Sequence, residues 1–206
     1  MSTSIESGRR AATAARRLVE TLVNNGAAGH DLDRVAGELD RIADQLAPTA
    51  RASRYAGTAG LSLGGEGNEA VMESHTVTGP ANPIAPFMTI DGSSDRVVGR
   101  VTYGHQYEGP PGCVHGGMLA AAFDIVLAVS AAKCGRMLVT GTLSVRYRRP
   151  TPLATELRFE GELVGIEGRK VRSSATVCGP DGESTAEAEG IFLIVDDDRY
   201  RPDGPA

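Results

Sequence analysis

The sequence lacks any uninterrupted apolar run near the roughly 20 residues that a helix needs to cross a bilayer. Polar residues follow Met1 and the next stretch, 9–18, is basic and alanine-rich, so an apolar signal-peptide core is missing. Cysteine is scarce as well. Cys113, Cys134 and Cys178 are odd in number and widely spaced, which argues against a disulfide framework. These absences predict a cytoplasmic protein without a membrane span.

An excess of basic residues is also lacking. The formal net charge is -5 and the pI about 5.4, so the basic footprint of a nucleic-acid-binding protein is not there. The sequence holds neither a P-loop nor a Gly-x-Gly-x-x-Gly run after a strand, which argues against nucleotide binding. His105, Cys113 and His115 lack the number and spacing of zinc ligands, so we expect no metal and no cofactor.

What is present suggests one domain with an appendage along 206 residues. Near the N-terminus, apolar residues recur at helical spacing, with a second amphipathic helix predicted over 31–46 and Asp31 as its N-cap. A glycine-rich stretch of linker composition follows. The expected parts are an N-terminal helical extension at 1–49, a linker at 50–68, the main domain at 69–197 and a tail at 198–206.

The main domain is predicted to contain strands, then one helix, then further strands. Strand-like stretches at 70–78 and 96–103 precede the apolar stretch 116–134, whose alanines and length favour a buried helix. Four further strands are predicted after it, at 137–147, 156–165, 169–179 and 184–195. This order predicts an α+β fold in which an antiparallel sheet wraps around one long central helix.

The loop at 107–117, Tyr-Glu-Gly-Pro-Pro-Gly-Cys-Val-His-Gly-Gly, leads into the predicted central helix. Its prolines and glycines stiffen and bend the chain, and Gly116 and Gly117 let the backbone approach a ligand. Unpaired amides at a helix N-terminus suit a carbonyl oxygen that is becoming negative. His115 is placed to donate a hydrogen bond to the same substrate or to orient it. The alternative interpretation is a tight turn without chemistry.

Asp124 is the single acidic residue of the apolar stretch. Burial of a carboxylate without a partner is costly, so we expect this side chain at a polar cavity or an interface. A structural ion pair with a basic side chain of a neighbouring strand is the alternative, because such pairs mimic catalytic ones.

Taken together, His115-Gly116-Gly117, Asp124 nine residues on, Thr140 sixteen further on and the strand 143–150 resemble a known family. This is the phenylacetate-pathway (PaaI-like) hot-dog group of acyl-CoA thioesterases, and within it thioesterase superfamily members 4 and 5. The likeness covers about 107–195. It implies a hot-dog fold and hydrolysis of an acyl-CoA thioester at a site built between two subunits.

The resemblance also implies roles. Amides around Gly116 and Gly117, with His115, polarise the thioester carbonyl from one chain. Asp124 of the partner chain acts as general base on a water or as nucleophile, and Thr140 positions that water. The sequence leaves base and nucleophile open, because both need an ionised carboxylate near the carbonyl carbon.

By the same resemblance, coenzyme A, as part of the substrate, contacts the strand after Thr140 and the following hairpin. The resemblance therefore implies that four basic residues bind the phosphates of coenzyme A: Arg146, Arg148, Arg169 and Lys170. Arg146 stands where we expect a smaller amide residue from the resemblance. Solvated charges on an exposed strand are the alternative for all four. A lone sheet of this kind leaves an edge and half a site, so a homodimer or a dimer of dimers is expected, with no nucleic-acid partner.

Two other functions stay open on the same fold. A non-catalytic acyl-CoA-binding or assembly module would keep the fold and the basic residues but could dispense with the carboxylate. A hot-dog hydratase or dehydratase is disfavoured, since such enzymes resemble one another in an Asp-x-Asn-Pro-x-His run. Asn82-Pro83 lacks both the aspartate and the histidine.

Overall fold

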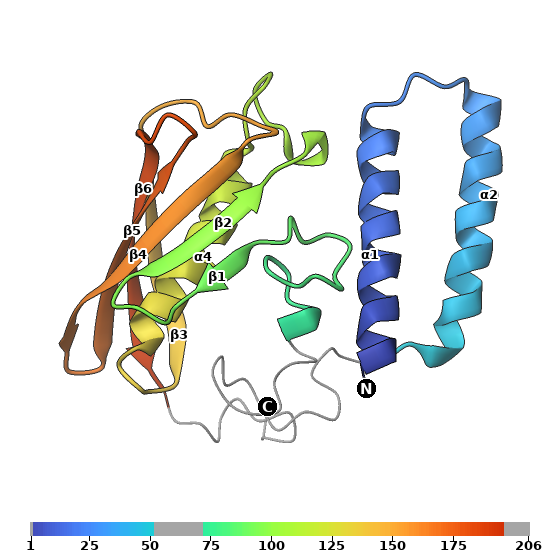
Figure 1. The fold of residues 1–206 in the computed structure, drawn as a ribbon. Helices are drawn as coiled ribbons and strands as arrows, with labels where there is room; N and C mark the ends of the chain where they lie inside the picture. Colours follow the sequence, from blue (N-terminus) through green and yellow to red (C-terminus); the bar gives the residue numbers. More distant parts are fainter. Residues whose placement is uncertain (1, 52–71, 196–206) are drawn as a thin grey trace.

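A single antiparallel sheet of six strands forms the main body of the molecule (Figure 1). The computed structural model describes residues 2–51 and 72–195. The strand order across the sheet is β1-β2-β4-β5-β6-β3. The strands are β1 (Thr89–Asp91), β2 (Val97–Thr102), β3 (Leu138–Tyr147), β4 (Glu156–Glu167), β5 (Lys170–Cys178) and β6 (Ser184–Ile194).

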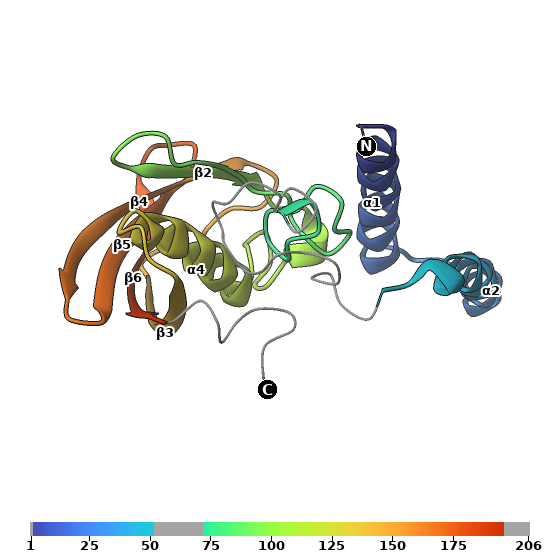
Figure 2. The ribbon, with the colours of Figure 1, turned by 90° about the horizontal axis from the view of Figure 1, so that it is seen from below.

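One helix, α4 (Gly116–Ala132), lies along the concave face of this sheet and packs against β2 to β6 (Figure 2). Its alanines and leucines are strong helix formers. Beyond Ala132 the chain turns at Gly135, which has a φ of 72° and donates its amide to the Ala132 carbonyl. The architecture is the hot-dog fold, as predicted.

The core lies between α4 and the sheet. Phe123 of α4 meets Phe159 of β4 edge to face, with ring centroids 5.1 Å apart. Small residues on the sheet let the helix come close: a methyl group added at Gly161 would lie 2.7 Å from Val126 Cγ1. The other fully buried side chains include Val97, Leu119, Val126, Leu127, Leu157, Val171, Val177 and Phe192. This packing buries one face of α4 against the sheet, so only the remaining face can contribute to a catalytic site.

Two helices, α1 (Ser2–Val23) and α2 (Gly29–Leu46), stand beside the main body, with α1 nearer to it in both views (Figures 1 and 2). Ala12 of α1 is buried, and Arg9 forms an ion pair with Glu73. Arg16 donates to the carbonyls of Asn82, at 2.8 Å, and Pro80, at 3.1 Å. The segment before β1 therefore anchors α1. Within the described residues α2 buries no side chain.

Several sequence predictions needed correction. The strand predicted at 70–78 is not formed in its described part, because the His75 ring accepts the amides of Val77 and Thr78 and holds a turn. The short β1 was not predicted. Asp31 lies in the first turn of α2, whose N-cap is Ala28. Most of the predicted linker at 50–68 lies outside the described residues.

Across 2–51 and 72–195, no helix is both long and apolar enough to span a membrane. The same residues contain no group of three or more histidine, cysteine or acidic side chains arranged to hold a metal ion. All three cysteines are free and half-buried.

Candidate active site

The loop before α4 is a compact hairpin that delivers His115 to the start of the helix. Glu108 and Val114 pair across it, and the His115 amide donates to the Tyr107 carbonyl at 2.9 Å. At its tip Gly112 has a φ of 73°, which favours glycine. His115 itself is the N-cap of α4, with its ring exposed to solvent.

Most amides of the first turn of α4 already have acceptors. The His115 carbonyl accepts from Met118 at 2.9 Å and from Leu119 at 3.3 Å. The Gly117 amide donates to Nδ1 of His115 at 3.0 Å. No hydrogen bond from the Gly116 amide is found to any described residue. Of the two glycine amides predicted to polarise a carbonyl, Gly116 is thus the one left available in this state.

Asp124 and Thr140, both predicted for the site, lie within hydrogen-bond distance of each other. Thr140 Oγ1 donates to Asp124 Oδ1 at 3.0 Å. Asp124 is half-buried and makes no ion pair with a described residue, which argues against the structural ion pair considered for it. The site therefore presents a carboxylate that has one hydrogen-bonded oxygen and no cationic partner among the described residues.

A β-bulge in β3 sets this contact. Thr140 pairs with Phe192 of β6, whereas Thr142 pairs with Ile191, so Gly141 is an extra residue. Before the bulge the even-numbered residues face α4, and after it the odd-numbered ones do, because side chains alternate along a strand. Thr140 thereby points at Asp124, while Tyr147 points at the start of α4.

The two halves of the predicted site do not meet within one chain. Asp124 lies seven residues beyond Gly117 on the same helix, which is about 10 Å along the axis. Reacting atoms need to be about 3–3.5 Å apart. A carboxylate so far from the helix N-terminus does not reach a carbonyl bound there.

Arg146 and Arg148 share an acidic partner on β6. Both guanidinium groups contact Glu187 Oε1, Arg146 at 3.4 Å and Arg148 more closely. The hydrogen bond from Arg148 is the main cause of a pKa for Glu187 below its ordinary value, with smaller effects of Arg146. The free protein therefore already balances part of this basic cluster with a carboxylate.

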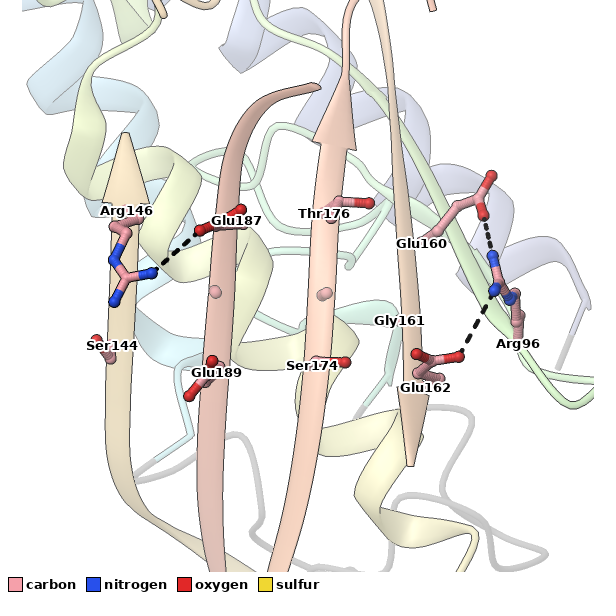
Figure 3. Close-up of a pocket in the computed structure, with 12 residues that line it drawn as sticks. Arg96, Ser144, Arg146, Glu160, Gly161, Glu162, Ser174, Thr176, Glu187 and Glu189 are labelled. Atoms are coloured by element: carbon pink, nitrogen blue, oxygen red, sulfur yellow. Dashed lines mark hydrogen bonds and ion pairs between the residues drawn. The ribbon is translucent and has the colours of Figure 1, made fainter. Parts of the chain in front are cut away.

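The outer face of the sheet carries a hollow of about 390 Å³, on the side away from α4 (Figure 3). Arg146 lines it and points to Glu187, while Arg96 on the far side points to Glu160 and Glu162 (Figure 3). The lining holds four carboxylates, since Glu189 is also part of it, and two guanidinium groups. Such surroundings disfavour a phosphate, so the assignment of Arg146 to coenzyme A is the weakest of the four.

Arg169 and Lys170 lie at the other end of the sheet. Lys170 pairs with Leu193 of β6 and Arg146 with Glu187, six residues away, or about 20 Å at the rise of a strand. Arg169 donates to the Ile194 carbonyl at 3.2–3.3 Å, and Lys170 forms no ion pair with a described residue. The structure thus separates the four predicted cations into two pairs.

Sequence reasoning missed Tyr147, which stands between Arg146 and Arg148. Its hydroxyl donates to the Gly116 carbonyl at 2.8 Å. The available signal was the strand alternation, which sends Tyr147 to the opposite face from the two arginines.

Comparison with known proteins gives two matches to family models. Residues 111–186 match the model of the thioesterase superfamily. Residues 8–54 match a model described as the N-terminal helical domain of hypothetical protein RHA1_ro05818. The helical region and the main domain are thus each similar to known sequences.

Among whole proteins, the chain is 32% identical over 105 residues to acyl-coenzyme A thioesterase THEM4 of Rattus norvegicus, covering 50% of this chain and 45% of that one. It is 34% identical over 91 residues to acyl-coenzyme A thioesterase THEM5 of Homo sapiens, covering 44% and 37%. The matches span less than half the length of these two thioesterases.

Among solved structures, the crystal structure of protein RHA08564, a thioesterase superfamily protein, has a TM-score of 0.77 and 38% identity, covering 90% of this chain and 94% of that one. A hypothetical thioesterase from Streptococcus pneumoniae TIGR4, solved with coenzyme A, has a TM-score of 0.50 and 19% identity, covering 53% and 90%. The second likeness concerns the fold alone.

Proposed function

The chain belongs to the thioesterase superfamily, and from this membership we propose that it hydrolyses an acyl-CoA thioester to a free acid and coenzyme A. The observation that carries the proposal is the Asp124 carboxylate, which accepts a hydrogen bond from Thr140 and has no cationic partner among the described residues. An unneutralised carboxylate can take a proton from water or attack a carbonyl carbon itself.

We place the catalytic groups on two protomers. The distance of about 10 Å along α4 between Gly117 and Asp124 supports this arrangement, because one thioester cannot bridge both within a chain. Around Asp124 the half-exposed face of α4 carries the small residues Ala121 and Ala128. A partner helix can approach such a face closely. The outer edge of β3, the last strand of the sheet, is free to pair with the same strand of a second copy.

In this arrangement one protomer supplies the Gly116 amide and His115 to the carbonyl oxygen, which becomes negative as the tetrahedral intermediate forms. Asp124 of the partner takes a proton from the attacking water, or attacks directly, and Thr140 holds that carboxylate in place. When Asp124 acts as base, the proton that it takes from water passes to the leaving sulfur, so coenzyme A leaves as the thiol. When Asp124 attacks directly, it forms a mixed anhydride with the acyl group, coenzyme A leaves and takes up a proton, and water then hydrolyses the anhydride to the free acid. Arg148, Arg169 and Lys170 are proposed for its phosphates, with Arg146 as a weaker candidate.

A hydratase of the same fold has less support. Asn82 uses its side-chain amide to donate to the Ser74 carbonyl at 3.0 Å and accepts the Ile84 amide at 3.1 Å. These contacts hold the segment before β1. Asn82 therefore has a structural role.

The first experiment measures thiol release from acyl-CoAs of graded chain length, with wild type and Asp124→Asn. We expect the variant to lose about 10²- to 10⁴-fold in kcat while coenzyme A binding, followed by calorimetry, stays within a few-fold. Binding of acyl-CoA without thiol release by either protein would instead support the non-catalytic acyl-CoA module.

The second experiment tests the shared site by mixing subunits. Asp124→Asn and His115→Ala are each inactive in our proposal, and their mixed dimers contain one intact site. Random reassortment of equal amounts should restore about a quarter of wild-type activity in a two-fold symmetric dimer. No recovery, despite subunit exchange confirmed by mass spectrometry, would place both residues in a site within one chain.

A further inference from the structure

The peptide unit between Gly116 and Gly117 is hydrogen-bonded at both ends. Its carbonyl accepts from the Tyr147 hydroxyl at 2.8 Å, and its N–H donates to Nδ1 of His115 at 3.0 Å. A hydroxyl that donates to a carbonyl polarises the amide and strengthens the N–H of the same unit as a donor. One amide plane thus connects the tyrosine of β3 to the imidazole at the start of α4.

This connection selects the tautomer of His115. A ring nitrogen that accepts a hydrogen bond carries no proton, so the neutral ring must hold its proton on Nε2. Nε2–H is then a donor on a ring that is exposed to solvent. That is the form needed to hydrogen-bond a carbonyl oxygen that gains negative charge.

The surroundings of Tyr147 show why the contact is specific. A methyl group added at Gly116 would lie 3.2 Å from Cζ of Tyr147, so the tyrosine ring packs directly over this glycine. Tyr147 is paired with Ala186 on β6, which fixes its position along the strand. The tyrosine is 53% exposed, so it contributes little to the core.

We propose that Tyr147 is a positioning residue that holds His115, through the Gly116–Gly117 peptide, as an Nε2–H donor for the thioester carbonyl. The inference rests on the proposed hydrolysis for its consequence in catalysis. The hydrogen-bond network itself is testable without substrate.

Tyr147→Phe is the informative variant, and Tyr103→Phe is its matched control. The Tyr103 hydroxyl donates to the Met118 carbonyl at 3.2 Å, in the same first turn of α4 but on a peptide that does not contact the imidazole. Both variants lose one hydroxyl that donates to the backbone of this turn. Only Tyr147→Phe breaks the path to His115.

Imidazole nitrogen NMR at about pH 8, where an ordinary histidine is neutral, reports the tautomer. The His115 signals are assigned by their loss in His115→Gln. We expect Nε2–H in wild type and in Tyr103→Phe, and a mixture of tautomers in Tyr147→Phe. With acyl-CoA, Tyr147→Phe should lower kcat by about 3- to 10-fold, the effect of one lost hydrogen bond, with KM within about twofold.

Three results would overturn the inference. They are Nδ1–H on His115 in wild type, an unchanged tautomer in Tyr147→Phe, and a changed tautomer with unchanged kcat. A fourth outcome has a different meaning. Here wild type shows the Nε2–H form, Tyr147→Phe loses it, and wild type releases no thiol from any acyl-CoA. It would refute the proposed hydrolysis and the catalytic use of His115 while leaving the hydrogen-bond network in place.

Discussion

Gly161 of β4 lies against α4, and Gly161→Ala tests how closely the helix is held. The added methyl would lie 2.6 Å from Ser130 Oγ and 2.7 Å from Val126 Cγ1. Neither can move aside easily: both residues are fully buried, and the Ser130 hydroxyl is hydrogen-bonded to the Val126 carbonyl at 2.8 Å. The helix must therefore shift away from β4.

Overpacking a well-packed core costs about 1–3 kcal/mol, which for a chain of this size lowers Tm by about 2–12 °C. The control is Gly165→Ala on the same strand, where the added methyl meets no atom within 4 Å. That change should be neutral or stabilise slightly, because alanine restricts the unfolded chain more than glycine does.

Thermal and urea unfolding followed by circular dichroism give the two stabilities. Since α4 carries Asp124, we also expect Gly161→Ala to lower kcat more than Gly165→Ala does. Equal stability of the two variants would show that α4 has room to move above β4. The close packing described between helix and sheet would then be wrong.

Further predictions concern the site and α1. Thr140→Val should lower kcat about 5-fold with little change in KM, because it removes a hydrogen bond to a charged group that is partly in water; an unchanged kcat would exclude a positioning role. Arg148→Ala should raise KM for acyl-CoA, more so at low salt, as steady-state kinetics at two ionic strengths would show. In that variant the pKa of Glu187 should rise toward the ordinary carboxyl value, as followed by NMR titration. The pKa is lower in the folded state, so Glu187 favours folding above the ordinary carboxyl pKa and loses this effect as the pH falls through the folded value. Ala12→Asp buries a charge under α1 and should speed hydrogen exchange in α1 but not in β5; exchange in α1 equal to that of wild type would show that α1 is not anchored there.

The order of strands and helix was predictable because the signals are local. Leu157 and Phe159 alternate with polar residues along β4, and 116–134 combines helix-forming alanines with apolar length. The 70–78 stretch misled because its β-branched residues favour a strand, whereas the His75 ring satisfies two backbone amides in a turn. Propensity does not reveal such a side-chain acceptor.

The sequence could nominate candidate residues for the site, but it could not give their geometry. The family spacing pointed to Asp124 and Thr140, and they form a hydrogen bond. The hydrogen bond from the Gly117 amide to the His115 ring depends on the rotamer of His115. The hydrogen bond from Tyr147 to the Gly116 carbonyl depends on the strand register beyond the bulge. Neither is written in the spacing of residues. The separation of Arg146 from Lys170 likewise follows from the register of β3 and β5 on β6, which links distant parts of the chain.

The extra residue at Gly141 gives β3 one place where its length can change. Without Gly141, Thr140 and Thr142 would be consecutive, as their partners Phe192 and Ile191 already are, and regular alternation would keep both Thr140 and Val145 on the α4 side. A residue lost from another part of the strand, with the bulge kept, would instead turn the rest of the strand over. A shorter β3 can therefore arise at the bulge without exchanging the two faces of the sheet.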